Sequence, residues 1–514
     1  MTTSTNPGPN LDLLGAAVVG SHDGLPVLGS LINGVGAGAA GDTSAARLSP
    51  ATGRALFLGS EATGETGDAA VAAARTSVRE SSWGRASGRD RARVLARTAH
   101  LIEERAEQLA QLLLLETGKP IREARGEVAS CVNAFEYFSG LARDINGRTL
   151  RDVGDDVFAF TLREPAGVAG LIVPFNFPLG ILGQKLPPAL AAGCSVVLKP
   201  SPLTPMTALA VAQLLQEAGL EPGALSVLVG GGSAGAEMVS HPHTDVISFT
   251  GSTATGRHIA ASAGTNRLKR VAIEAGGKTP VIVTRNADVE ATVEGLLFAS
   301  FFNQGQVCVA GSRILADAAI AEDLTARLAE RAQEIRLGDP ASETTEMGPL
   351  ISQQHFETVL TNVERATAEG AELVTGGGRA SIAGTSASPY LEPTVLFSGT
   401  DANHSVREEF FGPVTTVQAY TDLADATSRA NSQQYGLAAS VWTKDVDEAL
   451  DLTFGLDAGT VWVNGSTDSY PELPLGGRRD SGFAPEFGRE GMEFFTDLKT
   501  VQIRRGHREA WYGR

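Results

Sequence analysis

Hydrophobic residues recur with a helical period along residues 88–117, and this stretch predicts a long amphipathic helix. The apolar positions fall three or four residues apart, which places them on one face of an α-helix. They are Leu95, Ala99, Ile102, Ala106, Leu109 and Leu113. The segment TGKP (117–120) carries a glycine and a proline and ends this helix. A second helix is expected from there to about Arg143.

From residue 166 the pattern changes to short apolar runs that alternate with helical segments. Such alternation is typical of a parallel sheet covered by helices, so a nucleotide-binding α/β layer is predicted here. The expected strands are 168–173, 225–230, 245–251, 269–277 and 279–284, and the expected helices are 206–219 and 254–264. The pattern resumes from 310 to about 465, which indicates a second α/β domain beyond a boundary near 275–285.

The total charge and composition narrow the classes of partner. The chain has 514 residues, enough for at least two hydrophobic cores, and its net charge is −17. A negative chain of this size is expected to bind neither nucleic acid nor an anionic membrane surface. Residues 1–45 are rich in Gly, Ala, Ser and Thr and predict a loose N-terminal arm with a few short strands.

Cysteine usage and the N-terminal sequence favour the cytoplasm. Cys131, Cys194 and Cys308 lie far apart and form no CxxC pair, so we expect neither a disulfide framework nor a metal site. No Lys or Arg precedes Arg47, which argues against a secretory or transit peptide. The longest apolar run, 168–183, is short and interrupted by prolines, and it is not expected to cross a membrane.

Three short motifs suggest other functions, and each has a plainer interpretation. GAGAAG (36–41) matches a dinucleotide-binding pattern, but no helical segment follows it, so a flexible turn is expected. GGSAG (231–235) places Ser233 between a strand and a helix, as in serine hydrolases, yet no histidine and acid follow in the usual order. HPH (241–243) has no further ligand at metal-binding spacing and is interpreted as a polar loop.

The segment FTGSTATG (249–256) ends a strand and begins a helix. Its serine and threonine side chains can cap that helix, and the free backbone N–H groups at a helix N-terminus favour a phosphate. A phosphate site and a plain helix cap both fit this pattern.

Cys308 is the strongest candidate for chemistry, although a lone cysteine is most often a small buried residue. It follows Asn303, Gly305 and Gln306, which do not belong in a packed helix interior and leave the sulfur reachable. Glu274 ends a predicted strand before two glycines, and Asn176 lies between two prolines in PFNFP. Thiol, carboxylate and amide together supply the nucleophile, base and oxyanion donor that acyl chemistry through a thioester needs.

With these residues in place, the chain resembles the aldehyde dehydrogenase superfamily over nearly its whole length, from about residue 48 to 501. Several separated motifs occur in the family order, which makes the resemblance far more specific than one pattern. They are PFNFP (174–178), LKPSPLTP (198–205), FTGSTATG, EAGGK (274–278), FFNQGQVC (301–308), EEFFGPV (408–414) and PLGGRRDSG (474–482).

The resemblance implies a catalytic role for five residues and oxidation of a small-molecule aldehyde to the carboxylic acid. Cys308 would attack the aldehyde, and the Asn176 amide with the Cys308 N–H would hold the oxyanion. After hydride transfer, Glu274 would activate the water that hydrolyses the thioester. Lys185 and Glu486 match positions that support the site or its proton relay, as does Lys278.

The resemblance also implies a site for NAD or NADP. In it, Lys199 and Glu409 would hold ribose hydroxyls, Phe411 would lie near the nicotinamide, and Ser252 would contact the pyrophosphate. The remaining expected contacts are Val173, Pro174, Phe175, Pro202 and Gly251. Pro202 stands where many NAD-preferring members carry a glutamate, so the choice between NAD and NADP stays open.

Two alternatives concern the acyl group and the substrate. Members that transfer the acyl group to coenzyme A generally lack the carboxylate at Glu274, so hydrolysis is favoured. Semialdehyde-oxidising members often carry an arginine where Gln184 stands, and its absence disfavours a substrate with a far carboxylate. The segment SYPELPLGG (469–477) resembles some semialdehyde enzymes and points the other way.

The implied fold is α/β, with a Rossmann-like cofactor domain, an α/β catalytic domain and a small β oligomerisation arm. The N-terminal arm would cover 1–45 and the cofactor domain 46–144 and 166–280. The catalytic domain would cover 281–475, and the oligomerisation arm with the C-terminal tail would cover 145–165 and 476–514. A homodimer or homotetramer is expected.

Overall fold

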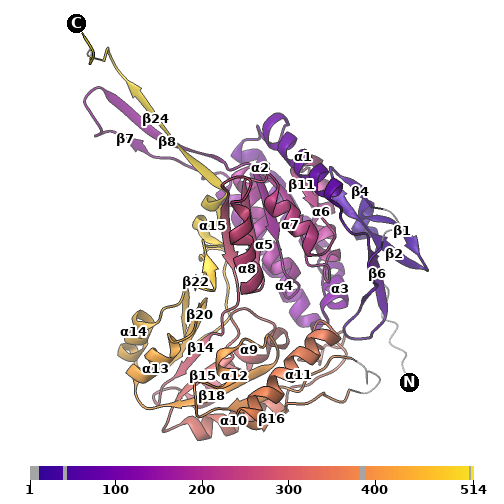
Figure 1. Ribbon diagram of the computed structural model, residues 1–514, viewed down its shortest axis with the longest axis vertical. Coiled ribbons are helices and arrows are strands. Elements are labelled where there is room, and N and C mark those ends of the chain that lie inside the picture. The colour runs from indigo at the N-terminus through magenta and orange to yellow at the C-terminus, as the bar shows by residue number, and fades with distance from the viewer. Residues whose placement is uncertain (1–10, 39–42, 383–387, 509–510, 514) are drawn as a thin grey trace.

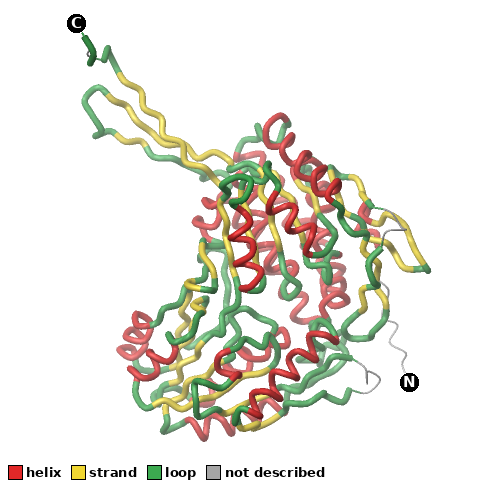
Figure 2. The backbone as a smooth tube through the Cα atoms, in the orientation of Figure 1, coloured by secondary structure: helices red, strands yellow, loops and turns green. Residues whose placement is uncertain are grey.

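The computed structural model describes residues 11–38, 43–382, 388–508 and 511–513. Two large sheets with their helices form the body, and a slender three-stranded sheet extends away from it (Figure 1). Strands alternate with helices through both large sheets, as the tube view shows (Figure 2). The α/β class expected from the sequence is therefore confirmed.

The first large sheet has eight strands in the order β23-β13-β12-β9-β10-β11-β3-β4. Its central strands, β13 to β11 in that order, are parallel. At the two ends of the sheet, β23, β3 and β4 run antiparallel to their neighbours. The bounds are β23 (Gly482–Phe483), β13 (Arg270–Glu274), β12 (Val246–Thr250), β9 (Val168–Ile172), β10 (Ser195–Lys199), β11 (Leu225–Val227), β3 (Ser30–Ile32) and β4 (Val35–Ala37).

Helices cover both faces of this sheet. Successive residues of a strand point to opposite faces, so a strand of apolar residues needs packing partners on both sides. In β10, Val196 and Leu198 belong to the largest core cluster, whereas Val197 packs with Ala70 and Val71 of α1. The helices are α1 (Gly64–Glu80), α2 (Gly88–Glu104), α3 (Ala106–Thr117), α4 (Ile121–Leu141), α5 (Pro178–Ala192), α6 (Met206–Glu217), α7 (Gly232–Ser240), α8 (Thr253–Ala263) and α15 (Gly488–Phe494), with the short helices η1 (Leu11–Ala17) and η2 (Pro222–Ala224).

The second large sheet has seven strands in the order β16-β17-β18-β15-β14-β20-β21, and only β16 is antiparallel. Its strands are β16 (Glu372–Thr375), β17 (Thr394–Phe397), β18 (Val414–Tyr420), β15 (Arg313–Asp317), β14 (Pro280–Val283), β20 (Ala438–Trp442) and β21 (Thr460–Val463). Its helices are α9 (Val289–Phe301), α10 (Ala321–Gln333), α11 (Gln353–Ala368), α12 (His404–Arg407), α13 (Leu423–Ala430) and α14 (Val446–Gly455), with η3 (Phe302–Gly305).

Three smaller sheets complete the described chain. The extended one, called here the arm, consists of β7 (Thr149–Leu150), β8 (Val157–Pro165) and β24 (Thr496–Arg504). A four-stranded sheet joins β1 (Val18–His22), β2 (Leu25–Leu28), β6 (Ala55–Gly59) and β5 (Arg47–Leu48), and β19 (Tyr435–Gly436) pairs with β22 (Arg478–Arg479). Among the described residues, no helix is long and apolar enough to cross a membrane.

The elements follow the sequence expectations closely, with one visible difference. The predicted helix over 88–117 is two helices, because Arg105 leaves the helical conformation with φ −110° and ψ 20°. The apolar face continues across this break, so periodicity alone cannot reveal it. Of the GAGAAG stretch, residues 39–41 lie outside the described residues. The domain boundaries themselves stay a prediction.

Candidate active site

Cys308 lies in an irregular segment between α9 and β15. Asn303, Gln304 and Gly305 all have positive φ, at 49°, 58° and 68°, so the chain turns sharply instead of continuing the helix. A side chain at position 305 would place its Cβ only 2.1 Å from the Gly412 carbonyl oxygen, which explains the glycine. The turn leaves Cys308 partly exposed while its neighbours are buried.

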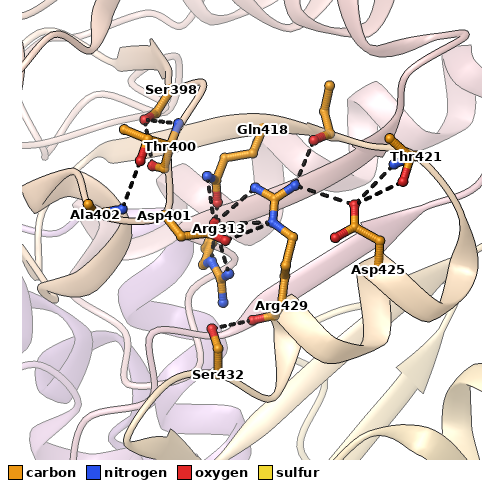
Figure 3. A network of polar contacts seen from close by, with 11 residues as sticks. Arg313, Ser398, Thr400, Asp401, Ala402, Gln418, Thr421, Asp425, Arg429 and Ser432 are labelled. Carbon is orange, nitrogen blue, oxygen red and sulfur yellow. Dashed lines mark hydrogen bonds and ion pairs between the residues drawn. The ribbon is translucent and has the colours of Figure 1, made fainter.

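The far end of this segment is fixed by buried polar contacts. The Gly311 carbonyl accepts hydrogen bonds from Ser300 and Thr415, each at 3.0 Å. Arg313, fully buried at the start of β15, lies in the network of Figure 3, where its Nε donates to Gln418 at 3.4 Å. Asp401 joins Gln418 in that network, 3.7 Å from the Arg313 guanidinium. The cysteine segment is therefore held by the second sheet.

Glu274 reaches this segment from the end of β13 in the first sheet. The Cys308 Sγ donates to Glu274 Oε1 at 3.2 Å, and the Thr250 hydroxyl donates to Oε2 at 3.1 Å. The Glu274 side chain is only 2% exposed. Burial, with a smaller effect from the Glu486 charge, raises its pKa from the ordinary 4.5 to about 7. Burial, followed by the Glu274 charge, also raises the pKa of the Cys308 thiol.

Asn176 is buried close to the same segment. Its Nδ2 donates to the Gln306 carbonyl at 2.9 Å, which leaves a second N–H on that nitrogen to donate elsewhere. The backbone carbonyl of Asn176 accepts a hydrogen bond from Lys119 Nζ at 2.9 Å and another from Asn303 Nδ2 at 3.0 Å. The amide is thus held in place on both its backbone and its side chain.

Lys119 and Glu127 are functional candidates that sequence reasoning missed. The two buried side chains form an ion pair, and Glu127 also accepts from the backbone N–H groups of Leu179 and Gly180 at the start of α5. This carboxylate therefore caps the helix that follows Asn176. Lys119 lies in TGKP, whose glycine and proline indicate only the end of a helix, and its burial becomes visible only in the structure.

Lys185 and Glu486 meet although 301 residues separate them in the sequence. They form a buried ion pair, and Ser248 accepts from Lys185 at 2.9 Å and donates to Glu486 at 3.2 Å. The opposed charges act on Glu274, because Glu486 raises its pKa and Lys185 lowers it. Both expected proton-relay residues therefore lie next to the candidate base.

A cavity of about 900 Å³ leads to Cys308 and Glu274. Part of its wall is aromatic, with Phe302 stacked on Phe177 at 5.9 Å and on Phe298 at 4.8 Å between ring centroids. Gln184 also lines it. A thiol and a carboxylate in the lining of a partly aromatic cavity can receive a small organic molecule.

The expected cofactor residues gather at the carboxyl ends of the parallel strands, where ligands of such sheets bind. Val173, Pro174 and Phe175 follow β9, and Lys199 ends β10. Gly251 and Ser252 follow β12, and the Ser252 hydroxyl accepts from Thr255 N at 3.3 Å as the N-cap of α8. Pro202 lies in an exposed turn and offers no side-chain acceptor.

Glu409 and Phe411 reach this edge from the second sheet. Glu409 Oε1 accepts from Gly277 N at 3.0 Å, and a Cβ at Gly276 would lie 2.1 Å from its other oxygen. The Phe411 ring packs edge-on against Phe175 at 5.9 Å between centroids. His355, which sequence reasoning missed, contacts the Phe411 carbonyl through Nε2 at 2.8 Å. Phe411 itself has φ 54°, so this contact holds a left-handed backbone.

The donor set at this edge fits a dinucleotide. Burial lowers the pKa of Lys199 to about 8, and its Nζ donates to the Pro200 carbonyl at 3.2 Å, which leaves two further N–H donors. The N-terminus of α8 presents backbone N–H groups that favour a phosphate. A carboxylate at 409 supplies an acceptor for a hydroxyl, and the glycines at 276 and 277 leave room beside it.

The structure does not assemble the competing motifs. Ser233 is exposed in the first turn of α7, and among the described residues no histidine or acid is hydrogen-bonded to it. His241 pairs with Asp68 at 3.3 Å rather than with a metal-ligand set. Within the described ranges, no group of three or more candidate ligands could hold a metal ion.

Comparisons with known proteins agree with this geometry. A family model described as "Aldehyde dehydrogenase family" matches residues 38–501. An aldehyde dehydrogenase of Davidiella tassiana is 38% identical over 88% of this chain and 90% of its own length. A betaine aldehyde dehydrogenase of Sinorhizobium fredii is 40% identical over 90% and 94%. A solved structure of betaine aldehyde dehydrogenase from Staphylococcus aureus with NAD+ is 35% identical, with a TM-score of 0.92, over 95% and 97% of the chains.

Proposed function

This chain belongs to the aldehyde dehydrogenase family and is an NAD(P)-dependent enzyme that oxidises an aldehyde, and from this premise we propose that Cys308, Glu274 and Asn176 perform the reaction and release a free carboxylic acid. The observation that carries the proposal is the 3.2 Å contact between the Cys308 sulfur and Glu274 at the end of the cavity. It places a nucleophile and a base against the same bound carbon.

In the first step the Cys308 sulfur adds to the aldehyde carbon. The thiol proton passes to Glu274 Oε1, to which the thiol already donates. The carbonyl oxygen becomes an oxyanion, and the second Asn176 N–H and the Cys308 backbone N–H stabilise it. The bound nicotinamide cofactor supplies the hydride acceptor that turns this adduct into a thioester.

The second step is hydrolysis of that thioester. Glu274, once it has lost the thiol proton, takes a proton from a water molecule, and the resulting hydroxide adds to the acyl carbon. The carbon–sulfur bond breaks and the acid leaves. The released Cys308 thiolate then takes the proton that Glu274 received from water, which restores the thiol and the carboxylate. A base whose pKa lies at about 7 can hold and release a proton at neutral pH, as this sequence requires.

We further propose that the substrate carries no carboxylate at its far end. Two of the three arginines that line the cavity are paired with acids: Arg331 with Glu294 at 2.8 Å and Arg336 with Glu346 at 2.6 Å. The third, Arg122, donates to the Thr345 carbonyl at 3.4 Å. Gln184 adds no charge. An anionic tail would therefore lose its hydration and, of these three arginines, find only Arg122 without an acidic partner.

The experiment is an aldehyde panel assayed with NAD and NADP, with reduced-cofactor absorbance as the signal and the product analysed with and without coenzyme A. The panel includes aliphatic and aromatic aldehydes, betaine aldehyde and succinate semialdehyde. Turnover to the free acid, lost in Cys308→Ser but kept in the matched control Cys131→Ala, is expected. Acyl-coenzyme A as the product, or activity that survives Cys308→Ser, would contradict the mechanism.

The arm supports assembly into a homo-oligomer, which we propose as a homodimer or homotetramer. Residues opposite each other in β8 and β24 share one face, and there Phe158 pairs with Ile503 and Phe160 with Val501. Phe158 and Ile503 are 45% and 49% exposed. A second copy would cover this apolar face. Light scattering of the purified protein tests the assembly, and a monomer would overturn it.

The three unpaired cysteines also fit a reducing compartment such as the cytoplasm.

A further inference from the structure

The choice between NAD and NADP depends on what surrounds the hydroxyl of the adenosine ribose that carries the extra phosphate in NADP. In the proposed cofactor site, Lys199 ends β10, and the neighbouring parallel strand β11 ends beside it, with Leu198 paired to Val227. The turn of residues 228–231 then leads from β11 into α7. Lys199 packs on this helix, since its Cδ lies 3.6 Å from the Cβ position of Gly235.

A carboxylate from a distant part of the chain lies on this turn. Glu61 belongs to the connection between β6 and α1, and its Oε2 accepts from Gly231 N at 2.8 Å. The backbone is fixed at the same place, because Ala62 N donates to the Val229 carbonyl at 2.8 Å. Glu61 is exposed, so its side chain lies at the surface rather than in the core.

The charges of Glu61 and Lys199 act on each other. Burial lowers the pKa of Lys199, and the Glu61 carboxylate raises it again in part. The negative charge of Glu61 therefore acts on the Lys199 ammonium group. A second acid, Glu237 of α7, lies between that helix and α1, 3.7 Å from the Cβ position of Gly67. The surroundings of the turn are negative, although a lysine is present.

We propose that Glu61 selects NAD over NADP, and so supplies from the segment before α1 the acceptor that Pro202 lacks. The proposal rests on the cofactor site proposed above. A ribose hydroxyl can donate to a carboxylate, whereas a 2′-phosphate placed against it meets like charge and no added cation. The side chain of Pro202, in the exposed turn after β10, is an apolar ring and offers no acceptor.

The test is a fluorescence titration of the purified enzyme with NADH and NADPH, which needs no turnover. The unchanged enzyme should bind NADH on the order of tenfold more tightly than NADPH, as expected for one like-charge contact at a protein surface. In Glu61→Gln, NADPH should bind about tenfold more tightly than before while NADH changes little. Raising the ionic strength should shrink the difference between the two proteins, since salt screens exposed charges.

Two further variants separate the effect of the Glu61 carboxylate on cofactor binding from the effects of a changed net charge or a disturbed fold. Glu65→Gln removes an exposed acid one turn further along α1 and should leave the NADH-to-NADPH ratio unchanged. Adding Pro202→Glu to Glu61→Gln should restore the preference for NADH, because it returns a carboxylate to the turn that follows Lys199.

Three results overturn the proposal: tighter binding of NADPH by the unchanged enzyme, an unchanged ratio in Glu61→Gln, or an equal shift in Glu65→Gln. Binding of neither cofactor overturns it together with the proposed cofactor site. Normal NADH preference without turnover leaves this inference standing and contradicts the catalytic mechanism instead.

Discussion

Replacing Glu274 with glutamine should make the protein more stable at neutral and alkaline pH. The folded state raises the pKa of this carboxyl from 4.5 to about 7. The carboxyl therefore holds its proton more tightly in the folded chain, and its contribution to stability is complete below about pH 4.5 and is lost as the pH rises to about 7. Glutamine is neutral throughout, so the variant loses nothing over this range.

The magnitude follows from the size of the shift. At about 1.36 kcal/mol per pKa unit, a change from 4.5 to about 7 amounts to about 3 kcal/mol of unfolding free energy. The side chain is 2% exposed, so solvent screens the effect little. The glutamine oxygen can still accept from the Thr250 hydroxyl. We therefore expect the Glu274→Gln variant and the unchanged protein to be about equally stable near pH 4, to differ by roughly 1 kcal/mol near pH 5 and by up to about 3 kcal/mol above about pH 7.

The assay is urea unfolding of both proteins at several pH values from about 5 to about 8.5. Glu322→Gln, an exposed change on α10, is the matched control and should show the same difference at every pH. A stability difference between Glu274→Gln and the unchanged protein that does not grow with pH would refute the reasoning. It would mean that the carboxyl titrates near its ordinary value and is not poised to exchange protons at neutral pH.

Two more predictions concern activity and a third concerns stability. Asn176→Ala should lower kcat by about 100-fold to 1,000-fold in the aldehyde assay, since it removes an oxyanion donor, and a loss below tenfold would argue against that role. Lys185→Met should move the acidic limb of the rate–pH profile upward, because Lys185 lowers the pKa of Glu274; a limb that stays in place contradicts the coupling. Gly305→Ala should destabilise the fold by about 2 kcal/mol or more, since its Cβ meets the Gly412 carbonyl at 2.1 Å at positive φ, as urea unfolding would show.

The sequence predicts the sheets and the strand-end residues well. Buried parallel strands appear in the sequence as apolar runs, so β9 and β11 to β14 fall where the pattern places them, whereas β10 was not predicted. Glu274 and Ser252 were singled out because they border such runs, and parallel strands present their carboxyl ends at one edge. Cys308 was recognised because its neighbours cannot belong to a helix interior, and the positive φ values of residues 303–305 give the physical reason.

Contacts between side chains on distant elements could not be predicted from the sequence pattern. Glu127 has the spacing of an ordinary helix residue, and only the packing of α4 on α5 brings its carboxylate to the N-terminus of α5. His355 and Glu61 lack any local signal, because their partners, Phe411 and Gly231, lie 56 and 170 residues away. Periodicity reports which face is buried, but not which polar group it meets there.

The buried pair of Lys185 and Glu486 is the feature that the fold alone explains least. Removing two charges from water costs several kcal/mol per ion, and apolar side chains of similar size would often serve stability as well. The proposed reaction gives the pair a purpose. Glu274 receives a proton from the Cys308 thiol and must release it before it can activate water. An acid beside it, held by a lysine and a serine, provides a group to which that proton can pass without crossing the substrate cavity.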